Sequence, residues 1–209
     1  MFNRQPKIQS VAWAWAIGWS LVSMGMVISD VYSSPNRGLI AYYVLGVTGW
    51  IIGVVGTIRY MRHMFGVDVH MIALSVTGWG VGALVAMVLG LFWMETWNLG
   101  FLGSPVGVAL GAAIGGALML PRGSQTSFVR IIRVSSVGAF SWGAAFLVFQ
   151  ILAFYVGYFL MLMTYNPLAS MVGWVWATVP GWTLPAGFFG FIAAWLAIKS
   201  LHITWYAED

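Results

Sequence analysis

Long apolar segments separated by short polar loops are the feature of this sequence that most restricts its fold. A helix of about 20 apolar residues is long enough to cross the roughly 30 Å hydrocarbon core of a bilayer. The 209 residues are 61% hydrophobic and only 7% charged, whereas about a quarter of the residues in a typical soluble domain are charged. So few charges would not cover the surface of a soluble fold of this size. The sequence therefore predicts an all-α, polytopic membrane protein.

Six segments are expected to cross the membrane as a single transmembrane domain, residues 1–209. Their expected bounds are about residues 10–29, 38–58, 69–94, 104–120, 134–163 and 184–198. The fifth would reach about 45 Å, so we expect it to tilt, protrude or break near Gly157. Residues 164–183 contain two prolines and three tryptophans, and this insertion is expected to form an interfacial or re-entrant helix.

The distribution of basic residues predicts the orientation. With six spans, eight of the nine fall on the side that holds both ends of the sequence: Arg4, Lys7, Arg59, Arg62, Arg122, Arg130, Arg133 and Lys199. Only Arg37 falls on the opposite side. The positive-inside rule makes the first side cytoplasmic. Because the basic residues form no run, topology explains the net charge of +4 better than nucleic-acid binding does.

Small residues beside tryptophans recur about 60 residues apart, in Gly18-Trp19-Ser20, Gly78-Trp79-Gly80 and Ser141-Trp142-Gly143. The even-numbered segments carry small residues three or four positions apart and then a basic residue. These patterns predict three parallel glycine-rich hairpins whose helices pack closely. The predicted helix-packing residues are Gly18, Gly49, Gly53, Gly78, Gly82, Gly107, Gly111 and Gly115.

Hairpins of this kind, with a glycine ladder and a terminal arginine, resemble uncharacterised bacterial multi-pass membrane proteins that repeat glycine- and tryptophan-rich units. The resemblance covers most of the chain. It implies a bacterial source, and hence the cytoplasmic membrane of a bacterium, but it transfers no functional residue.

Four polar residues are candidates for a polar path or for fastening helices together: Gln150, Thr48, Thr77 and Glu95. Gln150 lies near the middle of the fifth segment, where an amide in lipid must find partners. Thr48 and Thr77 occupy matching places before two Gly-Trp pairs, and their hydroxyls can bond a carbonyl one turn earlier. Glu95 lies at the end of the third segment, where it can remain hydrated.

No catalytic, cofactor-binding or metal-binding residue is predicted. The sequence has no cysteine, nucleophile elbow, phosphate loop or zinc-protease motif. Its three histidines, His63, His70 and His202, fall on the predicted cytoplasmic side without a recognised ligand spacing. We therefore expect a protein that is not an enzyme and needs no cofactor.

The composition favours a non-catalytic membrane subunit that acts in packing, assembly or oligomerisation. Its expected partners are the lipid bilayer and other membrane subunits or copies of itself, with no nucleic acid. The alternative is a small channel or transporter, or a substrate-binding transporter subunit, for a neutral or weakly polar solute. In that case Gln150, Thr48, Thr77 and Glu95 would lie near the path.

The predicted orientation is tested by single-cysteine labelling, because the chain has no cysteine of its own. His63→Cys, next to Arg62, is expected to react with an impermeant maleimide only from the cytoplasmic side. Asn36→Cys, next to Arg37, is the matched control and is expected to react only from the opposite side. Labelling of His63→Cys in intact spheroplasts would contradict the orientation.

Overall fold

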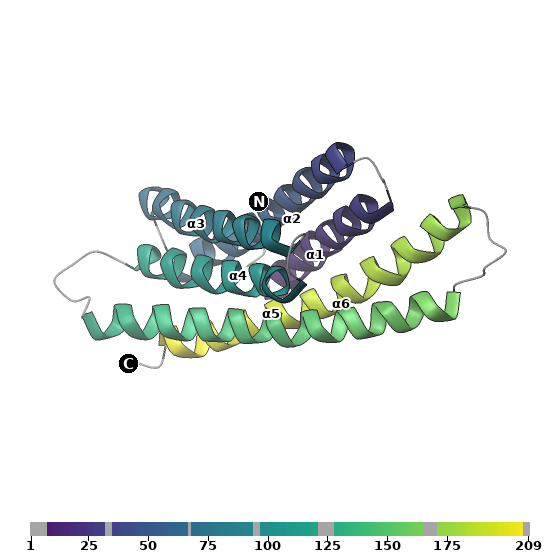
Figure 1. Cartoon of the computed structure of the whole chain (residues 1–209). Helices are drawn as coiled ribbons and strands as arrows, with labels where there is room; N and C mark the ends of the chain where they lie inside the picture. Colours follow the sequence, from purple (N-terminus) through teal and green to yellow (C-terminus); the bar gives the residue numbers. More distant parts are fainter. Residues whose placement is uncertain are drawn as a thin grey trace, which may run out of the picture. The chain divides into compact units, whose positions relative to one another are not determined.

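The protein is all-helical in the part of the chain that the structure describes. The structure is a computed structural model, and it describes residues 8–31, 35–66, 68–93, 97–120, 128–164 and 171–206. These contain six helices: α1 (Ile8–Val31), α2 (Pro35–Phe65), α3 (Val69–Trp93), α4 (Trp97–Met119), α5 (Phe128–Thr164) and α6 (Met171–Tyr206) (Figure 1). A helix satisfies its own backbone hydrogen bonds, which is the requirement that lipid imposes on apolar segments.

Five of these helices are long and apolar enough to cross a membrane. The qualifying stretches are Ile8–Ile28, Ile40–Met64, His70–Leu89, Phe128–Leu160 and Val179–Ser200. The fourth helix contains a shorter apolar stretch, Gly103–Met119. The helices thus indicate an integral membrane protein, as the composition predicts.

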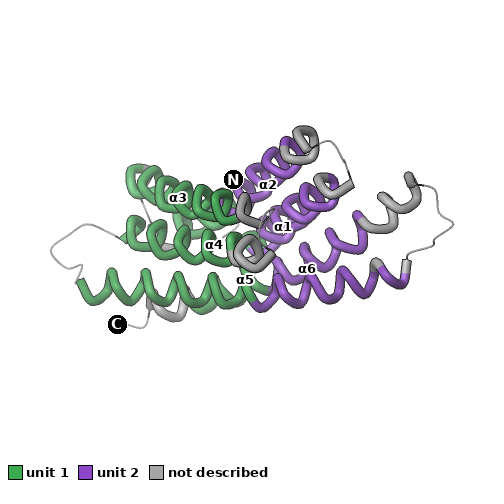
Figure 2. The backbone as a smooth tube through the Cα atoms, in the orientation of Figure 1, with its two compact units in different colours: residues 1–11, 56–147, 193–209 green, residues 12–55, 148–192 purple. Residues whose placement is uncertain are grey.

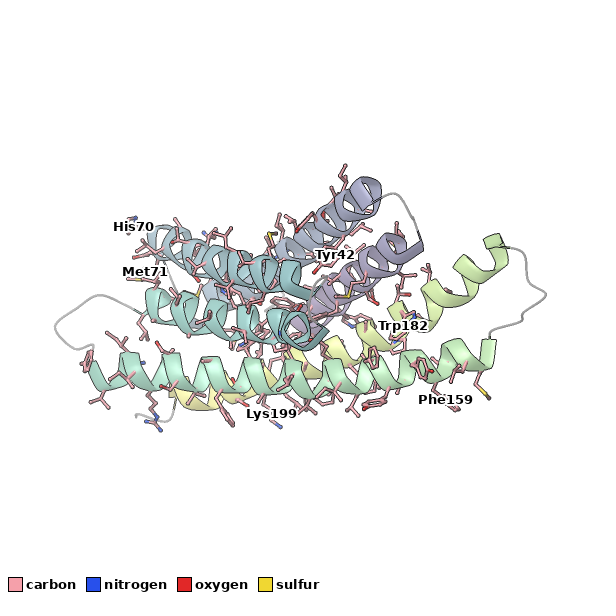
Figure 3. The ribbon with its side chains drawn as sticks, in the orientation of Figure 1. Tyr42, His70, Met71, Phe159, Trp182 and Lys199 are labelled. Atoms are coloured by element: carbon pink, nitrogen blue, oxygen red, sulfur yellow. The ribbon has the colours of Figure 1, made fainter. Side chains whose placement is uncertain are left out.

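The fifth helix is continuous through Gly157, where a break was one of three possibilities that the sequence left open. α5 has 37 residues, about 55 Å at 1.5 Å per residue, and it continues through Gly157 without interruption. Gly157 is buried, and a Cβ at this position would lie 2.6 Å from the ring of Trp182 (labelled in Figure 3). This glycine therefore provides room for an aromatic neighbour and does not end the helix.

The sixth helix begins earlier than expected. Residues 171–183, which we expected in an interfacial or re-entrant helix, are continuous with the sixth segment, although α6 contains Pro180 and Pro185. Each proline removes one helical hydrogen bond, a loss that membrane helices tolerate where hydroxyls and neighbouring helices supply other bonds. Thr183 lies between the prolines, and its hydroxyl donates to the Val179 carbonyl at 2.8 Å. The hydroxyl of Ser20 on α1 donates to the Thr183 carbonyl at 3.1 Å.

The chain, expected as a single transmembrane domain, forms two compact units (Figure 2). Unit 1 comprises residues 1–11, 56–147 and 193–209, and unit 2 comprises residues 12–55 and 148–192. The first part of α5 belongs to unit 1 and the second to unit 2, whereas α6 begins in unit 2 and ends in unit 1.

An edge-to-face tryptophan pair lies in each unit. In unit 1, Trp79 and Trp142 are 5.7 Å apart at 80°, and Trp142 also stacks on Phe146 at 5.6 Å. In unit 2, Trp15 and Trp50 are 5.8 Å apart at 82°. Edge-to-face contacts of this kind add about 0.5–1.5 kcal/mol to the burial of the rings. Bulky aromatic pairs therefore fill the interior of both units.

Trp142 is expected to be essential for stability because its side chain is only 1% exposed. Trp142→Ala should lower the free energy of unfolding by about 3–5 kcal/mol, the usual cost of emptying such a volume. The matched control is Trp13→Ala, since Trp13 is 62% exposed. Thermal denaturation in detergent, followed by size-exclusion chromatography, compares the two. Equal midpoints for both variants would refute the assignment of Trp142 to the core.

Candidate functional site

The motif Thr-Gly-Trp occurs on two helices and presents the same two faces in both. In α2, Thr48 is exposed and Gly49 is buried, and in α3 Thr77 is exposed and Gly78 is buried. The Thr48 hydroxyl donates to the Val44 carbonyl at 2.7 Å, and the Thr77 hydroxyl donates to the Leu74 carbonyl at 2.5 Å. Each threonine therefore satisfies its hydroxyl on its own helix, while the glycine next to it meets a neighbouring helix.

In unit 2, α1 and α2 approach each other at Gly18 and Gly49. A Cβ added to Gly18 would lie 2.5 Å from the Gly49 carbonyl oxygen, and one added to Gly49 would meet the Gly18 carbonyl oxygen. One turn further along α2, a Cβ on Gly53 would lie 2.5 Å from the Trp15 ring. Glycine is thus required at these three positions because backbone or an indole ring occupies the space of a side chain.

In unit 1, α3 and α4 form a longer contact of the same kind. A Cβ on Gly78 would lie 2.6 Å from the Gly115 nitrogen, and one on Gly82 would meet the Gly107 carbonyl oxygen and lie 2.8 Å from the Gly111 nitrogen. Such close approach permits dispersion and weak Cα–H···O contacts, which hold helices together in lipid. Gly78 meets Gly115, whereas the later residue Gly82 meets the earlier residues Gly107 and Gly111, so the two helices are antiparallel.

Trp79 lies along the same α4 glycines. A Cβ on Gly111 would lie 2.6 Å from its six-membered ring, and a Cβ on Gly115 would lie 2.7 Å from its Nε1. Ser75, one turn before Trp79, is completely buried beside Gly115. The α4 glycines therefore accept both the α3 backbone and an indole.

The candidate polar residues differ in their surroundings. Thr48 and Thr77 are exposed, whereas Gln150 is half-buried on α5 with its Oε1 atom enclosed by protein. Glu95 lies outside the described residues. Within the described ranges, no group of three or more His, Cys, Asp or Glu residues is arranged to hold a metal ion.

A second small-residue contact lies between α1 and α6 in unit 2, at two glycines of the sixth segment that share the predicted small-residue spacing but are not among the eight named packing residues. A Cβ on Gly187 would collide with the Ser20 hydroxyl, and one on Gly190 would lie 2.8 Å from Trp19. The absence of a side chain at Gly187 thus lets Ser20 reach the Thr183 carbonyl. The spacing of Gly187 and Gly190 by three residues was the available signal.

α3 also has an outward face that carries a glycine. Gly80 is exposed, and a Cβ at this position would meet no atom within 4 Å. Exposed residues at helical spacing surround it: Ala73, Val76, Thr77, Val81, Leu84 and Val88. We name this set, with Gly80, the outer face of α3. This face is exposed, whereas the face of Gly78 and Gly82 is buried against α4.

Comparison with known proteins assigns no relative. No protein-family model matches the chain, and no curated protein or solved structure matches it either.

Two glycines on α3 allow a matched test of close packing. Gly82→Leu is expected to destabilise the protein by at least about 1–3 kcal/mol, because the new side chain must displace the α4 backbone. Gly80→Leu places the same side chain in open space and should leave the thermal midpoint within a few degrees of the original. Midpoints are measured on the dissociated chain in a stringent detergent. An unchanged midpoint for Gly82→Leu would remove the close-packing explanation.

Proposed function

We propose that this chain is a non-catalytic integral membrane subunit that acts in packing, assembly or oligomerisation of a membrane complex. The observation that carries the proposal is the open outer face of α3, centred on Gly80. α3 uses one glycine face against α4 and leaves a second one uncovered within its own unit.

The chemistry of this outer face suits a helix of another subunit or of a second copy. Gly80 contributes no side chain among the exposed side chains of Val76, Val81 and Leu84, so a neighbouring helix could approach its backbone. Thr77 adds no unsatisfied polar group, since its hydroxyl is bonded to the Leu74 carbonyl. Membrane helices associate through small residues that allow close backbone contact, which is how α3 already meets α4.

The outward side of α2 in unit 2 has the same character. Ile40, Val44, Ile51 and Val55 are all more than half exposed, with Thr48 at the centre of their row. The bonded hydroxyls of Thr48 and Thr77 support an apolar contact better than they support a solute path.

The proposed setting is the cytoplasmic membrane of a bacterium, with six spans and both ends of the sequence in the cytoplasm. The apolar stretch Gly103–Met119 of α4 serves as the sixth span. Two features support its inclusion: α4 lies antiparallel to α3 along their glycine contact, and the count of six places eight of nine basic residues on one side.

The test is purification of the tagged chain from its native membrane in mild detergent. Native mass spectrometry and proteomics then identify what remains bound. The wild type should run as a complex of defined mass, and Gly80→Leu should shift at least tenfold toward the single chain without losing thermal stability. Val88→Leu, an apolar exchange near the end of the same face, is the matched control and should retain the complex.

Two results would count against the proposal. A wild-type chain that purifies alone from native membranes, at every mild detergent tried, would show that no assembly forms. Specific flux of a small neutral solute through proteoliposomes of the single chain would instead favour a channel or transporter.

A further inference from the structure

The second half of α5 carries a row of exposed side chains on the side opposite Gly157, the glycine that lies against α6. The spacing of the row alternates between four and three residues, which places its members in one line along the helix. Phe159, one of them, projects from α5 away from the ribbon of α6 (Figure 3). We name this set the α5 row. Its members all belong to unit 2 and are at least 40% exposed: Val148, Leu152, Tyr155, Phe159 and Leu162.

Tyr155 gives the α5 row a polar group that its own helix does not satisfy. Exposed apolar residues at helical spacing also occur on α2 and α3, so the spacing alone does not identify what covers α5. On those helices the Thr48 and Thr77 hydroxyls bond a carbonyl of their own helix. The rigid ring of Tyr155 instead carries its hydroxyl away from the backbone. This side chain is 66% exposed, and its hydroxyl forms no hydrogen bond within the described part of the chain.

Contacts within unit 2 place Tyr155 far from the helix ends. Gly157 lies beside Trp182, and the next residue of α6 accepts a hydrogen bond from Ser20 on α1, so these residues share one level. Along α1, the first charged residue beyond Ser20 is Asp30, ten residues or about 15 Å away. Tyr155 itself is nine residues, about 14 Å, before the end of α5. Both distances are about half the thickness of the hydrocarbon core, so the Tyr155 hydroxyl lies in the interior of the membrane.

A phenol in the hydrocarbon core needs a hydrogen-bond partner, which lipid tails do not supply. Copies of one chain have the same orientation in the membrane, so a symmetric pair of α5 helices is parallel and each residue of the row faces its own counterpart. A residue that faces itself must be self-complementary. Tyr155 is, because a phenolic hydroxyl is both a donor and an acceptor. No charged residue lies between positions 148 and 164 to repel its counterpart.

We propose that α5 pairs with α5 of a second copy of this chain along the α5 row, with the two Tyr155 hydroxyls hydrogen-bonded to each other. Alternating spacings of four and three are those of helices that pack side by side at about 20°. The pairing rests on the proposed role in assembly and names one partner, a second copy. Its contact surface is the α5 row, which is separate from the outer face of α3.

Cysteine cross-linking in native membranes tests the pair, because the chain has no cysteine of its own. Val148→Cys and Leu162→Cys, at the two ends of the row, should form disulfides between copies on oxidation with copper phenanthroline. The matched control is Val156→Cys, since Val156 is exposed but lies beside the row. It should give about tenfold less product of twice the chain mass, because a disulfide needs Cβ atoms about 3.5–4.5 Å apart.

The hydroxyl contact is tested by Tyr155→Phe, which keeps the ring. The dissociation constant of the pair in lipid vesicles, measured by energy transfer between labelled copies, should rise about threefold or more. Tyr158→Phe is the matched control, since Tyr158 is an exposed tyrosine beside the row, and it should stay within about twofold of the wild type. Neither change should alter the thermal midpoint of the dissociated chain.

Three results would overturn the proposal. The first is equal cross-linking of Val148→Cys and Val156→Cys, or no product from either; if the wild type still runs as a complex in native mass spectrometry, the proposed function stands without this pair. The second is a cross-linked product that contains a different protein, which would assign the α5 row to another subunit. The third is an unchanged dissociation constant for Tyr155→Phe.

Discussion

Close backbone contact at glycine is the interaction on which the described helix pairs depend. In lipid, apolar side chains gain little by leaving the solvent, so helices must attract each other through tight packing. Gly18 with Gly49 in unit 2, and Gly82 with Gly107 in unit 1, bring backbones together where a side chain would collide. Tryptophan then fills the remaining space, as Trp79 does along Gly111 and Gly115. A large side chain on one helix thus fits against glycines on the next, and the two features stabilise the same contact.

The helices were predictable because a long apolar segment has few alternatives in a membrane. The continuity of α5 and α6 was harder to predict. Gly157 and Pro180 are both helix-weakening residues, and sequence alone does not reveal that the Trp182 ring lies against Gly157 or that Ser20 bonds the Thr183 carbonyl between the two prolines of α6. The three-hairpin repeat remains a prediction, and the observed contacts follow a different register: Gly18 meets Gly49, whereas Gly78 meets Gly115.

The sequence predicts which residues of the candidate site share a helix face, but not which neighbour covers each face. Helical spacing shows that Gly78 and Gly82 share a face and that Gly80 lies on another, but it does not show which face another helix covers. For Thr48 and Thr77, the bond to a preceding carbonyl followed from their chemistry, because a hydroxyl in an apolar helix has its own backbone within reach. For Gly187, the spacing of small residues indicated a packing face but not its partner Ser20, which is distant in the sequence.

The contact between Gly18 and Gly49 has an entropic consequence. A lysine or methionine that becomes ordered at an interface gives up about 1.5–2 kcal/mol of rotamer freedom, whereas glycine has no rotamers to lose. The attraction between these two backbones is therefore not offset by side-chain ordering. It also leaves the helices little freedom to rotate about their axes, since any turn would bring a neighbouring side chain into the space that only glycine leaves empty. A contact made of the smallest residues can thus define the geometry of a hairpin more narrowly than one made of large, adaptable side chains.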